Sequence, residues 1–157
     1  MQSLSESYSQ AISSISSRLS PPVCLSALVG MYSLSALSKF ISDEHKRLFP
    51  TLPSWFWSLA GGYELVMTAL LLHGDLFLAV PMSYTYLGGA VSAGVLLSPG
   101  LRKLPLTVLP SVFIVITSSL GHHNRLDIFP LMPICCCSGF LMGVLLGYPG
   151  HKEHESS

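Results

Sequence analysis

The residue with the clearest potential for chemistry is Glu64, the only charged residue between Trp55 and His73. A carboxylate inside a membrane-spanning segment costs at least roughly 2.5 kcal/mol, so it needs a partner. At helical spacing, Glu64 shares a stripe with Trp57, Gly61, Thr68 and Leu71, and this stripe should face other helices. Either Glu64 accepts protons or binds a ligand, or it is a hydrogen-bonded glutamate that fixes the register of its helix.

Four other residues are candidates for the surroundings of Glu64. The next apolar segment runs back across the membrane, so Tyr84, Thr85 and Tyr86 return to nearly the same depth, and we expect a Tyr or Thr hydroxyl there to donate to the carboxylate. Lys39 lies near the end of segment 22–41, at a depth that differs from that of Glu64 by about 10 Å. We therefore expect Lys39 to anchor the helix at the membrane surface, because a direct pair requires a tilted helix.

The cysteines and histidines do not predict a cofactor. Cys135, Cys136 and Cys137 diverge by about 100° per residue on a helix, so they cannot converge on one metal ion. We expect small buried side chains there, with acylation as the alternative. If all five segments span, several His and Asp residues emerge on the same side of the membrane. They could bind a metal ion, but we expect them to be solvated loop residues. They are His73, Asp75, His122, His123 and Asp127. We expect neither a metal ion nor a cofactor.

The distribution of charge predicts the class of protein. Half of the 157 residues are hydrophobic and only 10% are charged, with eight basic and eight acidic side chains. Soluble domains carry roughly a quarter charged residues, and the even balance gives no electrostatic reason for nucleic-acid binding. Segments of about 20 apolar residues can cross a bilayer as helices. The five that qualify predict an all-α, polytopic transmembrane helix bundle: 22–41, 55–73, 76–101, 104–121 and 128–150.

The residues between and beyond these segments form arms and connections. We expect the serine-rich residues 1–21 to be a disordered or interfacial arm, since a cleaved organelle signal would be rich in arginine and free of acids. Residues 42–54 should form a polar loop, and residues 74–75 a tight turn between two antiparallel helices. Residues 98–100 and 121–127 should make the later connections, and residues 150–157 a disordered polar tail.

Glycines mark the faces on which these helices should pack. Gly61 and Gly88 lie in the second and third segments, and the fifth carries Gly139, Gly143 and Gly147 in one row. Such rows allow two membrane helices to approach closely. We expect the fifth helix to pack through this row against a helix of this chain or of another chain.

The first four segments resemble the DoxX-like family of small four-helix membrane proteins over about residues 22–121. The shared features are Lys39 at the end of the first helix, the Gly61-to-Glu64 pattern in the second, and a short turn before two further helices. The additional helix over residues 128–149 and the short first loop depart from the family pattern. Functions differ within this family, since one bacterial member resembles a subunit of a quinone-linked oxidase and an animal branch acts as a chaperone. The resemblance therefore implies a fold rather than one activity.

Three functions are compatible with these features. We prefer a non-catalytic integral membrane protein that acts as an accessory subunit or assembly factor of a larger membrane complex. The alternatives are a quinone-contacting subunit of a membrane oxidoreductase and a small proton-coupled transporter that uses Glu64. The expected partners are the lipid bilayer and other membrane subunits, with homo-oligomers through the fifth helix as a further prediction. The sequence indicates a multi-pass protein but not which membrane holds it.

Overall fold

The computed structural model describes residues 4–49, 52–96 and 105–154, and these residues form an all-α structure, as predicted. Five of the helices have 19 residues or more, the N-terminal helix has 13, and a short helix of 5 residues lies in the first connection. The helices are α1 (Leu4–Ser16), α2 (Pro21–Ile41), α3 (Glu44–Leu48), α4 (Ser54–His73), α5 (Leu76–Leu96), α6 (Pro105–His123) and α7 (Ile128–His154).

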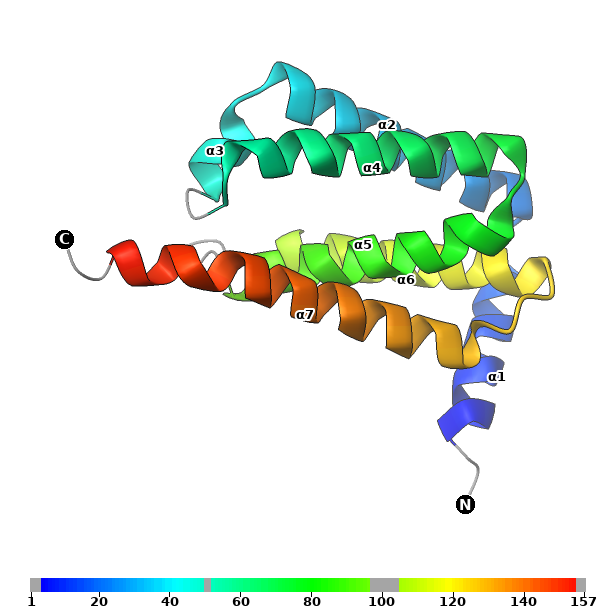
Figure 1. Cartoon of the computed structure of the whole chain (residues 1–157). Coiled ribbons are helices and arrows are strands. Elements are labelled where there is room, and N and C mark those ends of the chain that lie inside the picture. Colours follow the sequence, from blue (N-terminus) through cyan, green and yellow to red (C-terminus); the bar gives the residue numbers. More distant parts are fainter. Residues whose placement is uncertain (1–3, 50–51, 97–104, 155–157) are drawn as a thin grey trace.

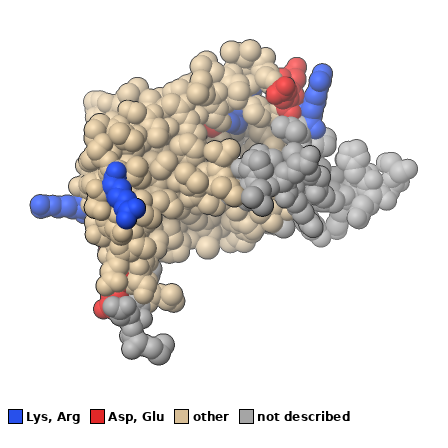
Figure 2. All heavy atoms as spheres, turned by 180° about the vertical axis from the view of Figure 1, so that it is seen from behind, with Lys and Arg blue, Asp and Glu red and all other residues tan. Residues whose placement is uncertain are grey.

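Three helices are long and apolar enough to cross a membrane. They are Pro21–Ile41, Ser54–His73 and Leu76–Val95. Helices α6 and α7 contribute shorter apolar stretches, Val108–His123 and Leu131–Leu146. Large hydrophobic side chains on the outer faces of α2, α4 and α7 are exposed, as expected where lipid replaces water. Seen from behind, the surface is largely uncharged, and the visible Lys, Arg, Asp and Glu side chains lie mainly toward the ends of the molecule (Figure 2).

The five long helices α2, α4, α5, α6 and α7 lie roughly along one direction in two layers (Figure 1). Helices α2 and α4 pack as a pair, and α5 packs against both α6 and α7. Contacts of α2 with α6 and of α4 with α5 join the layers, and Leu28, Tyr32 and Met67 are fully buried between them. The N-terminal arm and the C-terminus lie at opposite ends of the bundle in Figure 1.

The expected disorder of the N-terminal arm is wrong for residues 4–16, which form helix α1, whereas an interfacial position of the arm stays a prediction. This helix lies across the bundle and packs against α6 (Figure 1). The hydroxyls of Tyr8 and Ser118 are 3.0 Å apart, and Nε2 of His123 donates to the carbonyl oxygens of Ser16 and Leu19 at 3.0 and 2.8 Å. Polar contacts to α6 therefore hold this helix in place. The serine-rich composition of the arm did not predict these contacts.

Two other connections differ from the expected loop and tail. The connection between α2 and α4 contains the short helix α3. Phe49 and Leu52 of this connection are buried against Trp57, so the connection is only partly polar. Helix α7 continues to His154, which makes the beginning of the tail helical. The expected turn between α4 and α5 is confirmed, because Gly74 adopts a left-handed conformation (φ 85°) that glycine tolerates best. The predicted connection at 98–100 lies outside the described residues.

Candidate functional site

Helix α2 crosses α4 closely at Gly61, and this crossing positions the site. A Cβ atom at Gly61 would lie 2.9 Å from the ring of Phe40 and 3.6 Å from the carbonyl oxygen of Ala36. Because Gly61 has no side chain, the two helices approach at this level. Glu64 is almost one turn further along α4 and therefore faces the polar residues near the end of α2.

At this crossing, Lys39 and Glu64 form a buried ion pair. The ammonium of Lys39 donates to both carboxylate oxygens of Glu64, at 2.7 and 2.9 Å. The Glu64 side chain is 0% exposed and that of Lys39 is 6% exposed. The hydroxyl of Ser35, one turn before Lys39, donates to Glu64 at 2.6 Å and accepts from Lys39 at 2.6 Å. Two buried charges are thus paired on adjacent helices.

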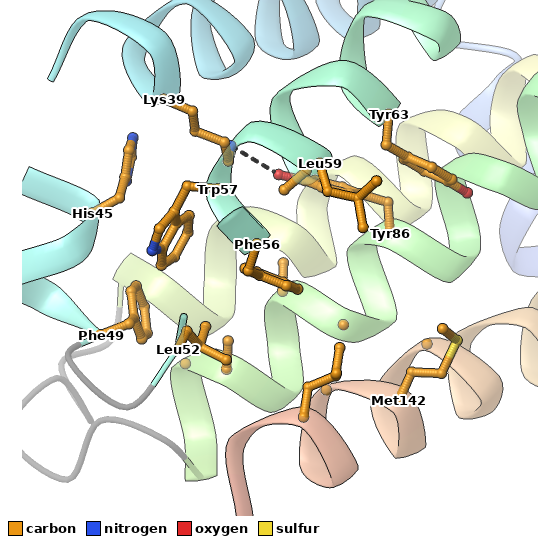
Figure 3. Close-up of a pocket in the computed structure, with 18 of the residues that line it drawn as sticks. Lys39, His45, Phe49, Leu52, Phe56, Trp57, Leu59, Tyr63, Tyr86 and Met142 are labelled. Atoms are coloured by element: carbon orange, nitrogen blue, oxygen red, sulfur yellow. Dashed lines mark hydrogen bonds between the residues drawn. The ribbon is translucent and has the colours of Figure 1, made fainter. Parts of the chain in front are cut away.

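Helix α5 completes this network with Tyr86. The Tyr86 hydroxyl donates to Glu64 and accepts from Lys39 at 3.1 Å. The dashed line in Figure 3 marks the bond between Tyr86 and Lys39. The Tyr86 ring stacks on Tyr63 and meets Tyr32 edge to face, so its position is fixed by aromatic neighbours. Of the hydroxyl donors expected at this depth, Tyr86 is therefore the one that bonds to Glu64.

The prediction that Lys39 anchors the helix at the membrane surface is wrong. That prediction compared depths along two helices that were assumed to begin and end at one level. The crossing instead places Gly61 beside Ala36 and Phe40. The remaining difference in level between Lys39 on α2 and Glu64 on α4 is small enough for the flexible side chain of Lys39 to reach the carboxylate.

Tyr84 belongs to a different polar cluster. It lies two residues before Tyr86, so about 200° of helical rotation directs the two side chains to opposite sides of α5. The Tyr84 hydroxyl is 2.8 Å from that of Ser118 on α6, and Ser118 also contacts Tyr8 of α1. Tyr84 is buried and links α5 to α6, and Ser118 extends this cluster to α1; the Tyr84 hydroxyl thus bonds to Ser118 rather than to Glu64.

Trp57, which shares the helical stripe of Glu64, also belongs to the site, together with Ser35 and His45, for which the sequence analysis proposed no role. The imidazole of His45 stacks on the indole of Trp57 with 5.4 Å between ring centroids, and its Nε2 lies 2.8 Å from the hydroxyl of Ser38. Partial burial, helped by the nearby Lys39 ammonium, lowers the pKa of His45. The spacing of Ser35 four residues before Lys39 could have predicted that both lie on one face of α2. No sequence pattern predicts the stacking of His45 on Trp57.

A cavity of about 420 Å³ lies next to this network. Its walls come from α2, α3, α4, α5, α6 and α7, together with residues of the first connection. Figure 3 shows Phe56, Tyr63 and Tyr86 on one side of it and Met142 of α7 on the other. Lys39 also contributes to the wall, so an apolar cavity borders the ion pair.

The glycine row of α7 packs inside the chain, against α5. A Cβ at Gly139 would overlap the carbonyl oxygen of Thr85, and one at Gly143 would overlap the hydroxyl oxygen of Ser92. In the opposite direction, a Cβ at Gly88 would overlap the backbone of Cys136. The predicted close packing is confirmed for these three glycines. The surroundings of Gly147 lie outside the described side chains.

The cysteines and histidines form no metal site among the residues that the structure describes. Cys135 and Cys136 are half-buried and Cys137 is exposed, so the expectation of three buried thiols is only partly met. His123, one of the grouped histidines, instead bonds to backbone oxygens of the N-terminal arm.

No protein-family model, curated protein or solved structure matches this chain. The resemblance to the DoxX-like family therefore has no support beyond its own motif residues.

Proposed function

We propose that the chain is a non-catalytic integral membrane protein that serves as an accessory subunit or assembly factor of a larger membrane complex. The observation that carries this proposal is the closed network around Glu64. The carboxylate receives hydrogen bonds from Lys39, Ser35 and Tyr86, and all three donors belong to this chain. Since the negative charge is neutralised and buried, the network is suited to hold three helices together rather than to exchange protons.

The outer faces of the bundle support a role in assembly. Leu34, Leu37 and Ile41 recur at helical spacing along α2 and are exposed by 71%, 51% and 81%. Such a stripe can contact lipid or the helix of another membrane subunit. We propose membrane subunits as partners on this face, and homo-oligomers through the outer face of α7 as an alternative assembly.

We also propose that all five apolar segments span the membrane, and that residues 22–121 keep the DoxX-like arrangement. The lengthwise alignment of the five long helices in Figure 1 supports the first point. The second is supported by the ion pair between Lys39 and Glu64 and by the close crossing at Gly61, since these are the three residues that carry the resemblance.

Affinity purification from native membranes in a mild detergent tests the assembly function. Mass spectrometry and a visible absorption spectrum should be recorded on the same sample. The proposal predicts a colourless complex with other membrane subunits. A variant with Leu34, Leu37 and Ile41 replaced by alanine should lose the partners, whereas Leu65→Ala and Val66→Ala on the exposed face of α4 should retain them. Recovery of the chain alone from native membranes would contradict the proposal.

A quinone-contacting subunit is the second candidate, favoured by the aromatic cavity beside Lys39. That function predicts redox subunits in the purified complex, with the absorption bands of flavin or haem. A proton-coupled transporter would require Glu64 to exchange its contacts with Lys39 for water during transport. Proton uptake in proteoliposomes that disappears in Glu64→Gln, with the amount of folded protein unchanged, would favour that third function.

A further inference from the structure

We infer that the cavity beside the ion pair holds one acyl chain of a bilayer lipid, whose headgroup stays at the level of α3. The cavity volume of about 420 Å³ lies within the range of small-molecule sites. The inference rests on the proposed place of the bundle in a membrane. It goes beyond the assembly function, because this chain binds the lipid without a partner subunit.

The polar side chains at the inner end of the cavity bond within the chain. Lys39 and Tyr86 both bond to Glu64. The Tyr63 hydroxyl donates to a backbone carbonyl of α5, and the Thr85 hydroxyl donates to a backbone carbonyl of its own helix. A water molecule needs about two to four polar partners, whereas an empty cavity forfeits the dispersion contacts of its walls. The inner end of the cavity therefore suits hydrocarbon better than water or a polar headgroup.

The lining of the cavity extends along the bundle over nearly the depth of one membrane leaflet. On α5 it runs from Thr85 to Gly94, a length of about 14 Å at a rise of 1.5 Å per residue. Half of a hydrocarbon core is about 15 Å thick. Figure 3 shows Phe49 and Leu52 of the first connection toward one end of the lining and Tyr63 toward the other. An acyl chain that lies parallel to the helices therefore matches the cavity in length.

The charges at α3 indicate which end of the cavity lies at the membrane surface. Lys46 of α3 and Asp43, directly before α3, form an ion pair and are exposed by 49% and 74%. Charged side chains are costly inside hydrocarbon, so this end of the bundle belongs near the headgroups. Tyr63 lies near the middle of α4. The terminal methyl group of the acyl chain should therefore lie beside Tyr63, and the ester group nearer to Phe49.

The cavity reaches the outer surface of the bundle between α4 and α7. Both helices pack on α5, whereas the described parts of α4 and α7 hardly touch each other. Leu59 of α4 and Met142 of α7 line the cavity and are exposed by 63% and 57% (Figure 3). Gly89, Ala90 and Ala93 of α5 form a floor with little side-chain bulk. An acyl chain can thus enter sideways from the bilayer.

Photo-cross-linking in lipid nanodiscs tests this site, with phosphatidylcholine that carries a diazirine in one acyl chain. Mass spectrometry then maps the labelled residues. A diazirine near the methyl end of the acyl chain should label Tyr63, whereas one near the ester should label Phe49 and Phe56. A diazirine in the middle should label the half-buried Ala90 at least as strongly as Leu34, although Leu34 on the outer face of α2 is exposed by 71%. Ordinary contact with the bilayer would instead follow exposure.

Matched variants separate binding in the cavity from contact with the surrounding lipid. Ala60→Leu and Ala90→Leu fill part of the cavity and should remove most of the labelling of Tyr63, whereas Ala69→Leu on the exposed face of α4 should leave it unchanged. Labelling of Leu34 should stay the same in all variants. The depth pattern in the unchanged chain decides the question even where a cavity variant fails to fold.

A photoactivatable sterol is the second probe, because a rigid ring system is the competing occupant of an apolar cavity. Stronger labelling of the cavity by the sterol than by phosphatidylcholine would overturn the inference. The same holds for labelling that only follows exposure, and for labelling of Tyr63 that persists in folded cavity variants. Such results would leave the assembly function untouched, since that function is read from co-purified subunits.

Discussion

Removal of either charge from the buried pair should destabilise the bundle strongly, whereas removal of both should cost less than the sum. The structure gives Lys39→Met and Glu64→Gln as the informative single variants, because each deletes one charge and keeps a side chain of similar size. In each variant the remaining charge, Glu64 or Lys39, stays buried and keeps only its hydrogen bonds to Ser35 and Tyr86.

The expected magnitude follows from the distance between the charges. Two unit charges 2.7 Å apart attract by about 6 kcal/mol at an effective dielectric constant of about 20. The cost of desolvating both groups cancels part of this attraction, and deletion of one partner from a buried pair typically costs about 3–5 kcal/mol. We expect each single variant to lose that much free energy of unfolding. The double variant should cost no more than one single variant, which gives a coupling energy of at least about 3 kcal/mol.

Titration with a denaturing detergent, followed by tryptophan fluorescence, measures these free energies. An exposed ion pair provides the control, since Lys46 and Asp43 are paired at 2.5 Å but exposed by 49% and 74%. Lys46→Met should therefore change the stability very little. If Lys39→Met cost no more than Lys46→Met, or if the two single costs were additive in the double variant, the pair would not hold the helices together and our reasoning would be wrong.

Three further predictions concern other parts of the molecule. The pKa of His45 is lowered from 6.5 in the folded chain, so on acidification the unfolded chain binds the proton first. The free energy of unfolding should therefore fall as the pH drops below about 6.5. The same detergent titration at each pH should show a smaller fall for His45→Gln. Gly139→Ala should separate α7 from α5 and lower the unfolding midpoint, whereas Gly62→Ala meets no atom within 4 Å and should be neutral or stabilising; unchanged stability of Gly139→Ala would contradict the packing. Five spans require the termini on opposite sides of the membrane, so a protease-protection map of tagged termini that places both on one side would exclude this topology.

The sequence by itself determined the class of fold and identified Glu64 as the residue that needs a buried partner. Long segments without charge must form helices in a bilayer, because their backbone groups have no water to bond, and a single carboxylate in such a segment requires a partner. The turn at Gly74 was also readable, since a glycine between two apolar helices favours a left-handed ending.

Only the tertiary structure decided which residues meet. The pairing of Lys39 with Glu64 depends on the level at which α2 crosses α4, and that level is set by the contact of Gly61 with Phe40 rather than by the number of residues in either helix. The choice of Tyr86 over Tyr84 depends on the rotation of α5 about its axis, which packing of α7 against Gly88 helps to fix. The burial of the Trp57 indole follows from the folding of the first connection onto α4, a contact between segments that periodicity does not specify.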